Sequence, residues 1–245
     1  MKALVLAAGY AVRLRPLTLN TPKPLLPVGG RPMIDYVVEK IDELDEVDSI
    51  YVVINHRFLD QFRAWLGKAP TSKHVRLIDD GSTSDENRLG AIGDMSLVVE
   101  RENIAEDLLV VGGDNLFTFS LRDFVSSYRE KGTSVVLHSC GDVALASRFS
   151  NVEMDSSGRI IHFQEKPENP KSDLVAICVY LFEPSALRLL RTYLDDGENP
   201  DAPGHFIEWL YKRIAVYGKP MGGEWFDIGN AEAYHKANRF FGGAP

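Results

Sequence analysis

Basic side chains gather in the first 34 residues, on a stretch rich in glycine and proline. The five are Lys2, Arg13, Arg15, Lys23 and Arg31, and no Asp or Glu accompanies them. Lys23 lies between Pro22 and Pro24, and a proline restricts both its own backbone and that of the residue before it. With Gly9, which lets a ligand approach the backbone, and Arg13, this rigid segment predicts a site for a polyanion.

Carboxylates and a second lysine follow at the ends of other apolar runs. Asp114 comes directly after such a run and two glycines, and Asp227 lies in Trp225-Phe226-Asp227. Carboxylates, together with phosphate oxygens and water, are the ligands that Mg²⁺ prefers. Lys166 stands before Pro167 at the end of another apolar run. Taken singly, each aspartate also fits a helix cap or turn, and the lysine fits a strand-end turn.

Alternating apolar patterns indicate the elements that position these residues. Periods of two and of 3.6 residues alternate along the first half of the chain, which is typical of βαβ units. We expect strands over 2–7, 49–55, 75–78, 107–111 and 134–138, with helices over 34–41, 58–66, 90–100 and 121–131. This order predicts a three-layer α/β/α sandwich around a Rossmann-like, mixed but mostly parallel sheet. Ligands of such sheets bind at the carboxyl ends of the strands.

The pattern changes after about residue 150 to short strands separated by turns. We expect strands over 151–154, 160–165 and 175–182, in a small mixed sheet laid on the first half, and helices over 184–194, 206–213 and 231–241. Repeats and long linkers are absent from the sequence. The pattern therefore predicts one domain over 1–245.

Charge and cysteine content exclude several other classes of protein. The net charge of −8 argues against binding nucleic acid or an anionic membrane through bulk charge, yet it divides into +5 over residues 1–34 and −13 elsewhere. The two cysteines, Cys140 and Cys178, form no CxxC motif and are expected to be buried thiols. The sequence carries neither a P-loop motif nor GxGxxG. Without a signal-peptide pattern, we expect a cytoplasmic protein.

The first loop resembles that of the sugar-nucleotide pyrophosphorylases, a nucleotidyltransferase family with a GT-A-like fold. Their pattern is roughly L-A-G-G-x-G-T-R-L-x-P-L-T followed by P-K-P-L-L-P-V. Leu6–Thr18 and Pro22–Val28 resemble this pattern in order and spacing, and among the departures Ala11 stands where the family usually has Gly and Val12 where it usually has Thr. The resemblance extends over nearly the whole chain, to about Phe241.

The resemblance implies transfer of a nucleotidyl group from a nucleoside triphosphate to a sugar 1-phosphate, with Mg²⁺ as cofactor. Arg13, Lys23 and Lys166 would be catalytic, and Asp114 and Asp227 would hold the metal. It further implies a nucleotide-binding half (1–150) and a sugar-phosphate-binding half (151–245). The nucleotide-binding residues would be Ala8, Gly9, Arg13, Lys23, Asp80, Gly81, Gly90 and Asp114, and the sugar-phosphate-binding residues Asn151, Glu165, Lys166 and Cys178.

The substrates are less clearly indicated by the sequence. The segment 79–94, where relatives read the base, keeps only part of the family's L-G-T-A-G, so dTTP or UTP is favoured and CTP and GTP stay open. Ser150 and Cys178 replace glycines that leave room for a hexose. Alternatives are a GT-A-like glycosyltransferase, a cytidylyltransferase acting on a non-sugar alcohol phosphate, and a non-catalytic nucleotide-sugar sensor. The expected partners are the two substrates and a possible second copy of the chain, with no nucleic acid or membrane.

Overall fold

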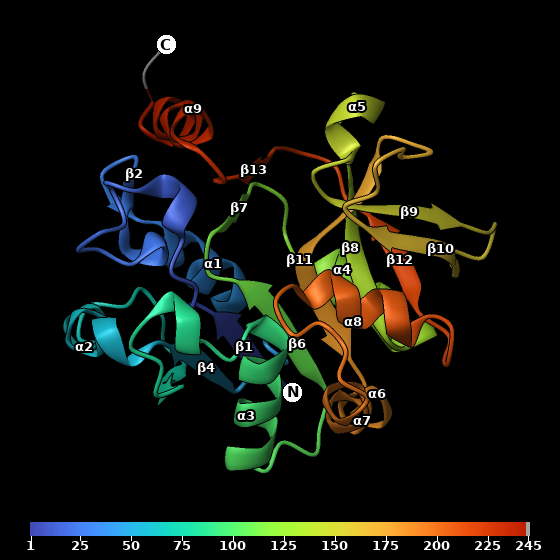
Figure 1. Cartoon of the computed structure of the whole chain (residues 1–245), viewed down its shortest axis with the longest axis horizontal. Coiled ribbons are helices and arrows are strands. Elements are labelled where there is room, and N and C mark those ends of the chain that lie inside the picture. The colour runs from blue at the N-terminus through green and yellow to red at the C-terminus, as the bar shows by residue number, and fades with distance from the viewer. Residues whose placement is uncertain (244–245) are drawn as a thin grey trace.

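A mixed β-sheet runs through the middle of the molecule (Figure 1). The structure is a computed structural model that describes residues 1–243. Within these residues the sheet has nine strands, in the order β10-β9-β11-β6-β1-β4-β5, with β8 paired to β11 and to β12. The strands are β1 (Lys2–Leu6), β4 (Ser49–Ile54), β5 (His74–Asp79), β6 (Leu108–Gly112), β8 (Ser134–Ser139), β9 (Ser150–Met154), β10 (Ile160–Glu165), β11 (Leu174–Phe182) and β12 (Tyr217–Pro220).

The register of the parallel strands brings their carboxyl ends to one edge of the sheet. β5, β4, β1 and β6 are parallel, as their apolar and β-branched runs predict. Leu6, at the end of β1, pairs with Val53 on one side and with Gly112 on the other. The loop after β1 and the turn that carries Asp114 therefore begin side by side.

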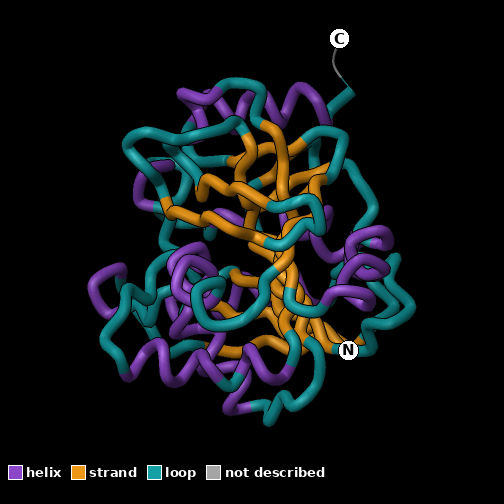
Figure 2. The backbone as a smooth tube through the Cα atoms, turned by 90° about the vertical axis from the view of Figure 1, so that its right-hand side faces the viewer, coloured by secondary structure: helices purple, strands orange, loops and turns teal. Residues whose placement is uncertain are grey.

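Helices cover both faces of the sheet, and Figure 2 shows the strands in orange between them. One face is covered by α1 (Met33–Asp42), α2 (Leu59–Leu66) and α4 (Arg122–Lys131), and the other by α3 (Ala91–Arg101), α6 (Pro184–Leu187), α7 (Leu189–Asp195) and α8 (Pro203–Leu210). The helices α5 (Val143–Ala146) and α9 (Ala231–Phe241) lie at the upper side of the molecule in Figure 1. The predicted three-layer α/β/α sandwich is thus confirmed.

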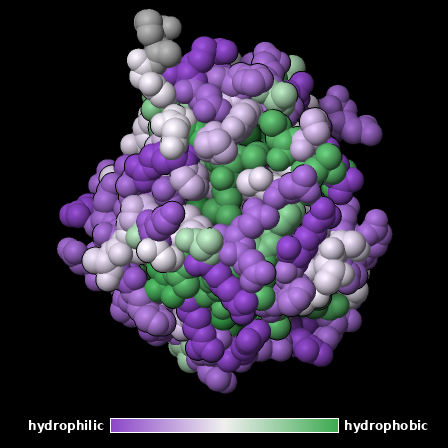
Figure 3. Space-filling model, turned by 90° about the vertical axis from the view of Figure 1, so that its left-hand side faces the viewer, coloured by the Kyte–Doolittle hydropathy of each residue, from purple (hydrophilic) through white to green (hydrophobic). Residues whose placement is uncertain are grey.

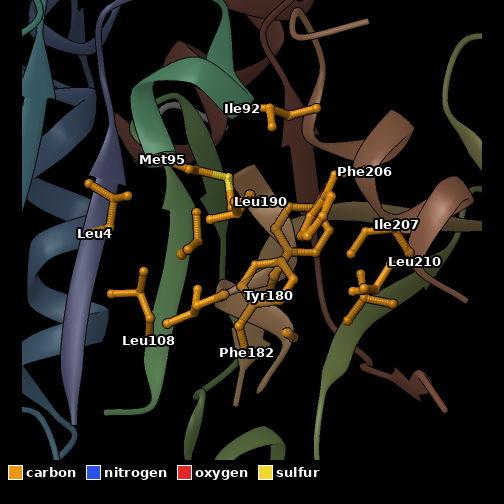
Figure 4. Close-up of a cluster of buried hydrophobic side chains, with 14 of the residues drawn as sticks. Leu4, Ile92, Met95, Leu108, Tyr180, Phe182, Leu190, Phe206, Ile207 and Leu210 are labelled. Atoms are coloured by element: carbon orange, nitrogen blue, oxygen red, sulfur yellow. The ribbon is translucent and has the colours of Figure 1, made fainter. Parts of the chain in front are cut away.

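The larger buried cluster shows how the sheet holds α3, α7 and α8 (Figure 4). Met95, Leu190 and Phe206, one from each helix, meet the sheet residues Leu4 and Tyr180 there. Each such side chain contributes about 1.5–3 kcal/mol through loss of contact with water. This packing fixes α3 and α8, which both approach the candidate site described below.

The strands after residue 150 do not form the predicted separate small sheet. β11 is a nine-residue apolar strand. Its length lets it pair antiparallel with β6 at one end, where Phe182 faces Leu108, and with β9 at the other, where Ala176 faces Ser150. One sheet consequently crosses both halves of the chain.

Other local expectations are corrected by the structure. The helix predicted over 184–194 is two helices that meet at Arg188. Cys140 and Cys178 are free, and each is partly rather than fully buried. The sequence patterns also missed two short ribbons, because two- and three-residue strands carry no period. They are β2 (Pro27–Val28) with β3 (Arg31–Pro32), and β7 (Asn115–Phe117) with β13 (Trp225–Asp227).

Figure 3 shows the side of the molecule that faces left in Figure 1, where apolar patches interrupt a mostly hydrophilic surface. The first loop contributes exposed apolar residues, namely Val12, Leu17 and Leu19. None of the helices in the described part of the chain combines the length and apolar character needed to cross a bilayer. The predicted second copy of the chain stays a prediction.

Candidate active site

Lys23 is held rigidly at the start of the Pro-rich loop. A short 3-10 turn spans Lys23–Leu25, with Pro24 inside it, and the Leu26 N–H closes it on the Lys23 carbonyl at 3.0 Å. The lysine is 9% exposed. Its side chain therefore has little freedom to lose when a ligand binds.

The C-terminal helix α9 fixes this loop from the other end of the chain. The hydroxyl of Tyr234 donates to the Pro27 carbonyl at 2.6 Å, and Asn238 accepts from the Gly29 N–H at 3.1 Å. Gly29 has a φ of +59°, and a Cβ there would lie 2.6 Å from the Phe241 carbonyl oxygen. Only glycine accommodates both the backbone angle and the close helix.

The β7–β13 ribbon places the two predicted metal ligands side by side. Asp227 pairs with Asn115 in the ribbon, so Asp114 precedes the residue that faces Asp227. The Lys23 Nζ lies 2.5 Å from Asp114 Oδ2. Asp227 is not the cap of α9, because Asn230 caps that helix by accepting from the Ala233 N–H. Asp114 lies in the turn between β6 and β7. The cap alternative for Asp227 is therefore excluded.

Asn115 is a positioning residue that the sequence analysis missed. Its Nδ2 donates to the Cys178 carbonyl at 3.3 Å, and its Oδ1 accepts from Trp225 Nε1 at 2.9 Å. The side chain thereby joins β7 to β11 and β13 within a buried strand. A buried polar side chain must find such partners. An Asn in the otherwise apolar run Asn115–Phe117, directly after a candidate ligand, is the signal that could have identified it.

Asp227 reveals which charges converge on the site. Burial raises the pKa of its carboxyl, and the negative charge of Asp114 raises it further, while Lys23, Arg13 and Lys166 lower it. The side chain is nevertheless accessible to solvent. A carboxyl that water can reach but that protein groups surround suits contact with an incoming polar ligand. The charges of Arg13, Lys23, Lys166 and Asp114 thus all act on Asp227.

The backbone of the first loop leaves open space beside the predicted phosphate site. A Cβ on Gly9 would meet no atom within 4 Å, and the Arg13 side chain is exposed. Ala8 is buried, and its carbonyl accepts from Asn55 Nδ2 at 2.9 Å. Ala11 has φ 45° and ψ 47°, the left-handed conformation for which relatives use glycine.

Lys166 and Glu165 end β10 beside α8. Lys166 has a φ of 46°, and its N–H donates to the Phe149 carbonyl at 3.1 Å. Its Nζ lies 3.3 Å from Glu165 Oε1. The Glu165 carboxylate is nearly buried and accepts from the Ser150 hydroxyl, while the Glu165 N–H donates to Glu208 at 3.1 Å. The Glu165 carboxylate is thus already hydrogen-bonded within the protein. One of its partners is Ser150, the serine that stands where the family usually has glycine.

Cys178 lies beside the metal-ligand turn. A Cβ on Gly112 would lie 3.2 Å from the Cys178 Sγ and 3.1 Å from Asp114 Oδ1, so glycine is required for this approach. Burial raises the pKa of the Cys178 thiol, and the Asp114 charge raises it further. The thiol stays protonated and is therefore not a nucleophile.

The structure does not bring every predicted residue to this cluster. Asn151 is buried, and its amide bonds the segment 171–174 through the Ser172 and Leu174 carbonyls and the Lys171 N–H, so it has no group left for a sugar phosphate. Gly90 has a φ of +79°, and a Cβ there would lie 2.6 Å from the Pro200 carbonyl oxygen. Glycine is therefore needed at position 90 for packing against residues 200–201 rather than for the approach of a ligand.

Asp80 and Gly81 lie at the carboxyl end of β5. Gly81 has a φ of +79° with open space around it. Asp80 accepts from both the N–H and the hydroxyl of Ser82, at 2.6 and 2.9 Å. Tyr10, next to Gly9, contacts the Ser82 hydroxyl at 3.1 Å. The two predicted nucleotide-binding loops are thus connected.

The two aspartates fit a Mg²⁺ ion that a phosphate also binds. Mg²⁺ is usually held by one or two carboxylates plus substrate phosphates and water. Among residues 1–243, no three acidic, histidine or cysteine side chains come together into a metal-binding group. The mutual repulsion of Asp114 and Asp227, and the lysine ammonium already against Asp114, show that the pair favours a cation.

A three-layer α/β sandwich of this kind binds its ligands at the carboxyl edge of the parallel strands, which is where the loop after β1 and the turn that carries Asp114 lie. The comparisons with known proteins specify this class further. The chain belongs to the nucleotidyl transferase family, whose model matches residues 2–242. The prediction of family is confirmed.

Individual relatives match almost all of this chain. The bifunctional protein GlmU of Methanocaldococcus jannaschii is 29% identical over 243 residues, which are 98% of this chain and 54% of that protein. A UTP–glucose-1-phosphate uridylyltransferase of Synechocystis is 28% identical, over 98% of this chain and 63% of its own. The chain thus spans about half to two thirds of the length of these relatives.

A solved structure of a UDP-glucose pyrophosphorylase complexed with UDP-glucose has the same fold. Its TM-score is 0.81 at 19% identity, and the match covers 98% of this chain and 97% of that chain. The single sheet and its helices are therefore the architecture of a known nucleotide-sugar enzyme.

Proposed function

We propose that the chain catalyses transfer of a nucleotidyl group from a nucleoside triphosphate to a sugar 1-phosphate, releasing pyrophosphate. The observation that carries this proposal is the convergence of Arg13, Lys23 and Lys166 on Asp114 and Asp227. A reaction between two phosphorylated substrates needs cations on both sides of the bond that forms and a place for a metal. Membership of the nucleotidyl transferase family supports the same reaction.

The residues act by position and charge. A sugar 1-phosphate is mostly a dianion at neutral pH, because its second pKa is about 6, so its attacking oxygen needs no general base. Lys166 holds that phosphate, and its backbone is fixed by Phe149. Arg13 and Lys23 neutralise the triphosphate and the departing pyrophosphate. Holding two polyanions in line in this manner replaces covalent catalysis.

Asp114 and Asp227 would hold Mg²⁺. The bound ion would supply charge neutralisation at the α-phosphate. Before substrate arrives, the Lys23 ammonium lies on Asp114 and limits the repulsion between the two carboxylates. A phosphate of the entering triphosphate would replace Asp114 as the partner of the fixed Lys23 ammonium.

UTP or dTTP is the proposed donor. Uridylyltransferase and thymidylyltransferase relatives support a pyrimidine, whereas guanyltransferase and adenylyltransferase relatives keep a purine as the alternative. The acceptor need not be glucose 1-phosphate, because the Ser150 hydroxyl is hydrogen-bonded to the Glu165 carboxylate and Cys178 lies beside the turn that carries Asp114. The observations therefore favour a phosphorylated acceptor that makes little use of the Glu165 carboxylate.

A matrix of five nucleoside triphosphates against sugar 1-phosphates and alcohol phosphates tests the proposal, scored by pyrophosphate release. Pyrophosphate that depends on one sugar 1-phosphate is the expected result. Release with an alcohol phosphate and CTP would support the cytidylyltransferase alternative. Nucleoside diphosphate released from a nucleotide-sugar would support a glycosyltransferase, and binding without turnover would support a sensor.

A further inference from the structure

A chain of hydrogen bonds links three segments around the predicted nucleotide site. Tyr10 belongs to the loop after β1, Asp80 and Ser82 to the loop after β5, and Asp94 to the first turn of α3. Tyr10 contacts the Ser82 hydroxyl at 3.1 Å, and Ser82 donates to Asp80 through its N–H and its hydroxyl. The carboxyl groups of Asp80 and Asp94 lie close enough that each shifts the pKa of the other.

Asp94 lies in an environment that is unfavourable for a negative charge. Its side chain is 6% exposed, and its Oδ1 is buried without a hydrogen-bond donor. The buried face of α3 on either side of Asp94, with Ile92 and Met95, belongs to a hydrophobic cluster. Two ionised carboxylates cannot form a hydrogen bond with one another, because both are acceptors only. Contact between Asp80 and Asp94 therefore requires a proton on one of them.

Charged groups on the surrounding elements do not offset this pair. Asp79, beside Asp80, is paired with His56 at 2.6 Å and accepts from the Gly81 N–H. On α3, Glu100 faces Arg191 of α7 at the far end of the helix. No cation contributes to the environment of Asp94 within the described residues, and the charge that acts on it is that of Asp80.

We propose that Asp94 keeps a proton and donates it to Asp80, and that this one-proton pair positions the Asp80–Ser82 loop and Tyr10 for nucleotide binding. This inference rests on the proposed function. Asp80 then accepts three donors, two from Ser82 and one from Asp94, out of the roughly four that an ionised carboxylate can accept. Asp94 is a positioning residue that acts through Asp80.

Loss of that proton would place two negative charges in contact in a buried site. Burial and the charge of Asp80 raise the pKa of Asp94 to about 8. Above that pH the pair repels, the Ser82 bonds are strained, and the link to Tyr10 weakens. If only the protonated pair binds nucleotide, apparent affinity falls about tenfold for each further pH unit.

The kinetic test compares the wild type with Asp94→Asn, whose amide can donate as the protonated acid does but cannot titrate. The KM of the nucleoside triphosphate is measured from pH 7 to 9.5 at saturating acceptor and Mg²⁺. We expect the wild-type KM to rise above pH 8 and that of Asp94→Asn to stay level, with equal values at pH 7. Asp123→Asn, an exposed aspartate in the first turn of α4, is the matched control and should follow the wild type.

A second measurement needs no activity. In the folded chain Asp94 keeps its proton up to about pH 8, whereas in the unfolded chain an aspartate loses it near pH 4. The folded state therefore binds more protons in this window, and wild-type stability must fall as pH rises through it and level off above it. Melting temperatures of Asp94→Asn should lack this slope.

Infrared spectroscopy of the wild type shows directly whether a carboxyl group of the pair is protonated, even if the Asp94→Asn variant fails to fold. A protonated-carboxyl band present at pH 7 and lost by pH 9 supports the pair, and its absence at pH 7 overturns it. Parallel pH profiles for wild type and Asp94→Asn would also overturn the inference. If the wild type releases no pyrophosphate at any pH, only the proposed function is rejected. The melting and infrared data still test whether Asp94 and Asp80 share a proton.

Discussion

The Nζ of Lys23 lies 2.5 Å from the Oδ2 of Asp114, although 91 positions separate the two residues in the sequence. The contact joins the loop after β1 to the turn after β6, two adjacent parallel strands. Lys23 is nearly buried, while Asp114 is about one third exposed. Because the carboxylate is open on one side and the lysine is held by the loop, a metal and a phosphate could take over the two halves of this pair without any movement of the strands.

Substitution of Lys23 by Ala should abolish most turnover and leave the fold intact. The ammonium supplies charge that a triphosphate needs, and loss of one such preorganised group typically lowers kcat by about 10²-fold or more. Steady-state pyrophosphate release and a melting curve measure the two effects. Lys68→Ala removes an exposed lysine and is the matched control. Near wild-type turnover in Lys23→Ala would contradict the proposed role.

Asn115→Ala should weaken both stability and the metal site. The change leaves the Trp225 indole N–H and the Cys178 carbonyl without their partner, at a cost of about 1–3 kcal/mol for each buried group left unpaired. The β7–β13 ribbon then no longer fixes Asp114 against Asp227, so more Mg²⁺ is needed for half-maximal rate.

Urea unfolding and a Mg²⁺ titration of the rate measure these two consequences of Asn115→Ala. Asn20→Ala, at an exposed position in the first loop, should change neither quantity. An Asn115→Ala variant that loses stability but keeps the wild-type Mg²⁺ dependence would limit Asn115 to a structural role.

Ala11→Gly should stabilise the protein. An alanine in the left-handed conformation is strained by roughly 1–2 kcal/mol, whereas the extra freedom of glycine in the unfolded chain costs roughly 0.5–1 kcal/mol. The net gain expected in the free energy of unfolding is about 0.5–1 kcal/mol. Ala64→Gly, the same change on the exposed side of α2, should instead lose about 1 kcal/mol. Equal signs for both variants would contradict this account.

The elements that could be predicted from the sequence are those with a long period or a motif. Strand 49–55 and helix 34–41 carry continuous apolar signals, and the structure has them as β4 and α1. The charged residues of the candidate site could be proposed because the motif around Lys23 is specific and the weaker motifs around Asp114, Lys166 and Asp227 follow it in the order of the family. The β7–β13 ribbon, which joins the two aspartates, is too short to leave a periodic signal.

Side chains whose role depends on a distant partner could not be predicted from the sequence. Asn151 and Gly90 were each expected to bind a substrate, yet tertiary contacts to 171–174 and to Pro200 account for them. Asp94 occupies a helical position that the 3.6-residue pattern makes buried. Its role becomes clear only from the nearby charge of Asp80, which lies in the loop after β5. In both cases the deciding information is a contact between segments that the chain brings together only on folding.

Gly204→Ala should disturb the part of the site that holds the acceptor phosphate, because it crowds the packing between α8 and the end of β10. A Cβ at Gly204 would lie 2.0 Å from Glu165 Oε2 and 2.6 Å from the Ser150 Oγ, so either the buried Glu165 carboxylate must be displaced or α8 and the end of β10 must separate. Overpacking of this kind costs about 1–3 kcal/mol of stability. Because Lys166 follows Glu165 directly, the displacement should raise the KM of the acceptor phosphate more than that of the nucleoside triphosphate.

Gly67→Ala provides the matched control for that overpacking. Gly67 ends α2 with an ordinary φ of −65°, and a Cβ there would have its nearest neighbour at 3.9 Å. Substitution at such a compatible position stabilises by about 0.4–1 kcal/mol through the unfolded state. Urea unfolding and the two KM values decide the comparison. An equal rise in both KM values for Gly204→Ala would mean that α8 supports the whole site rather than Lys166, and the acceptor would then need to be placed elsewhere.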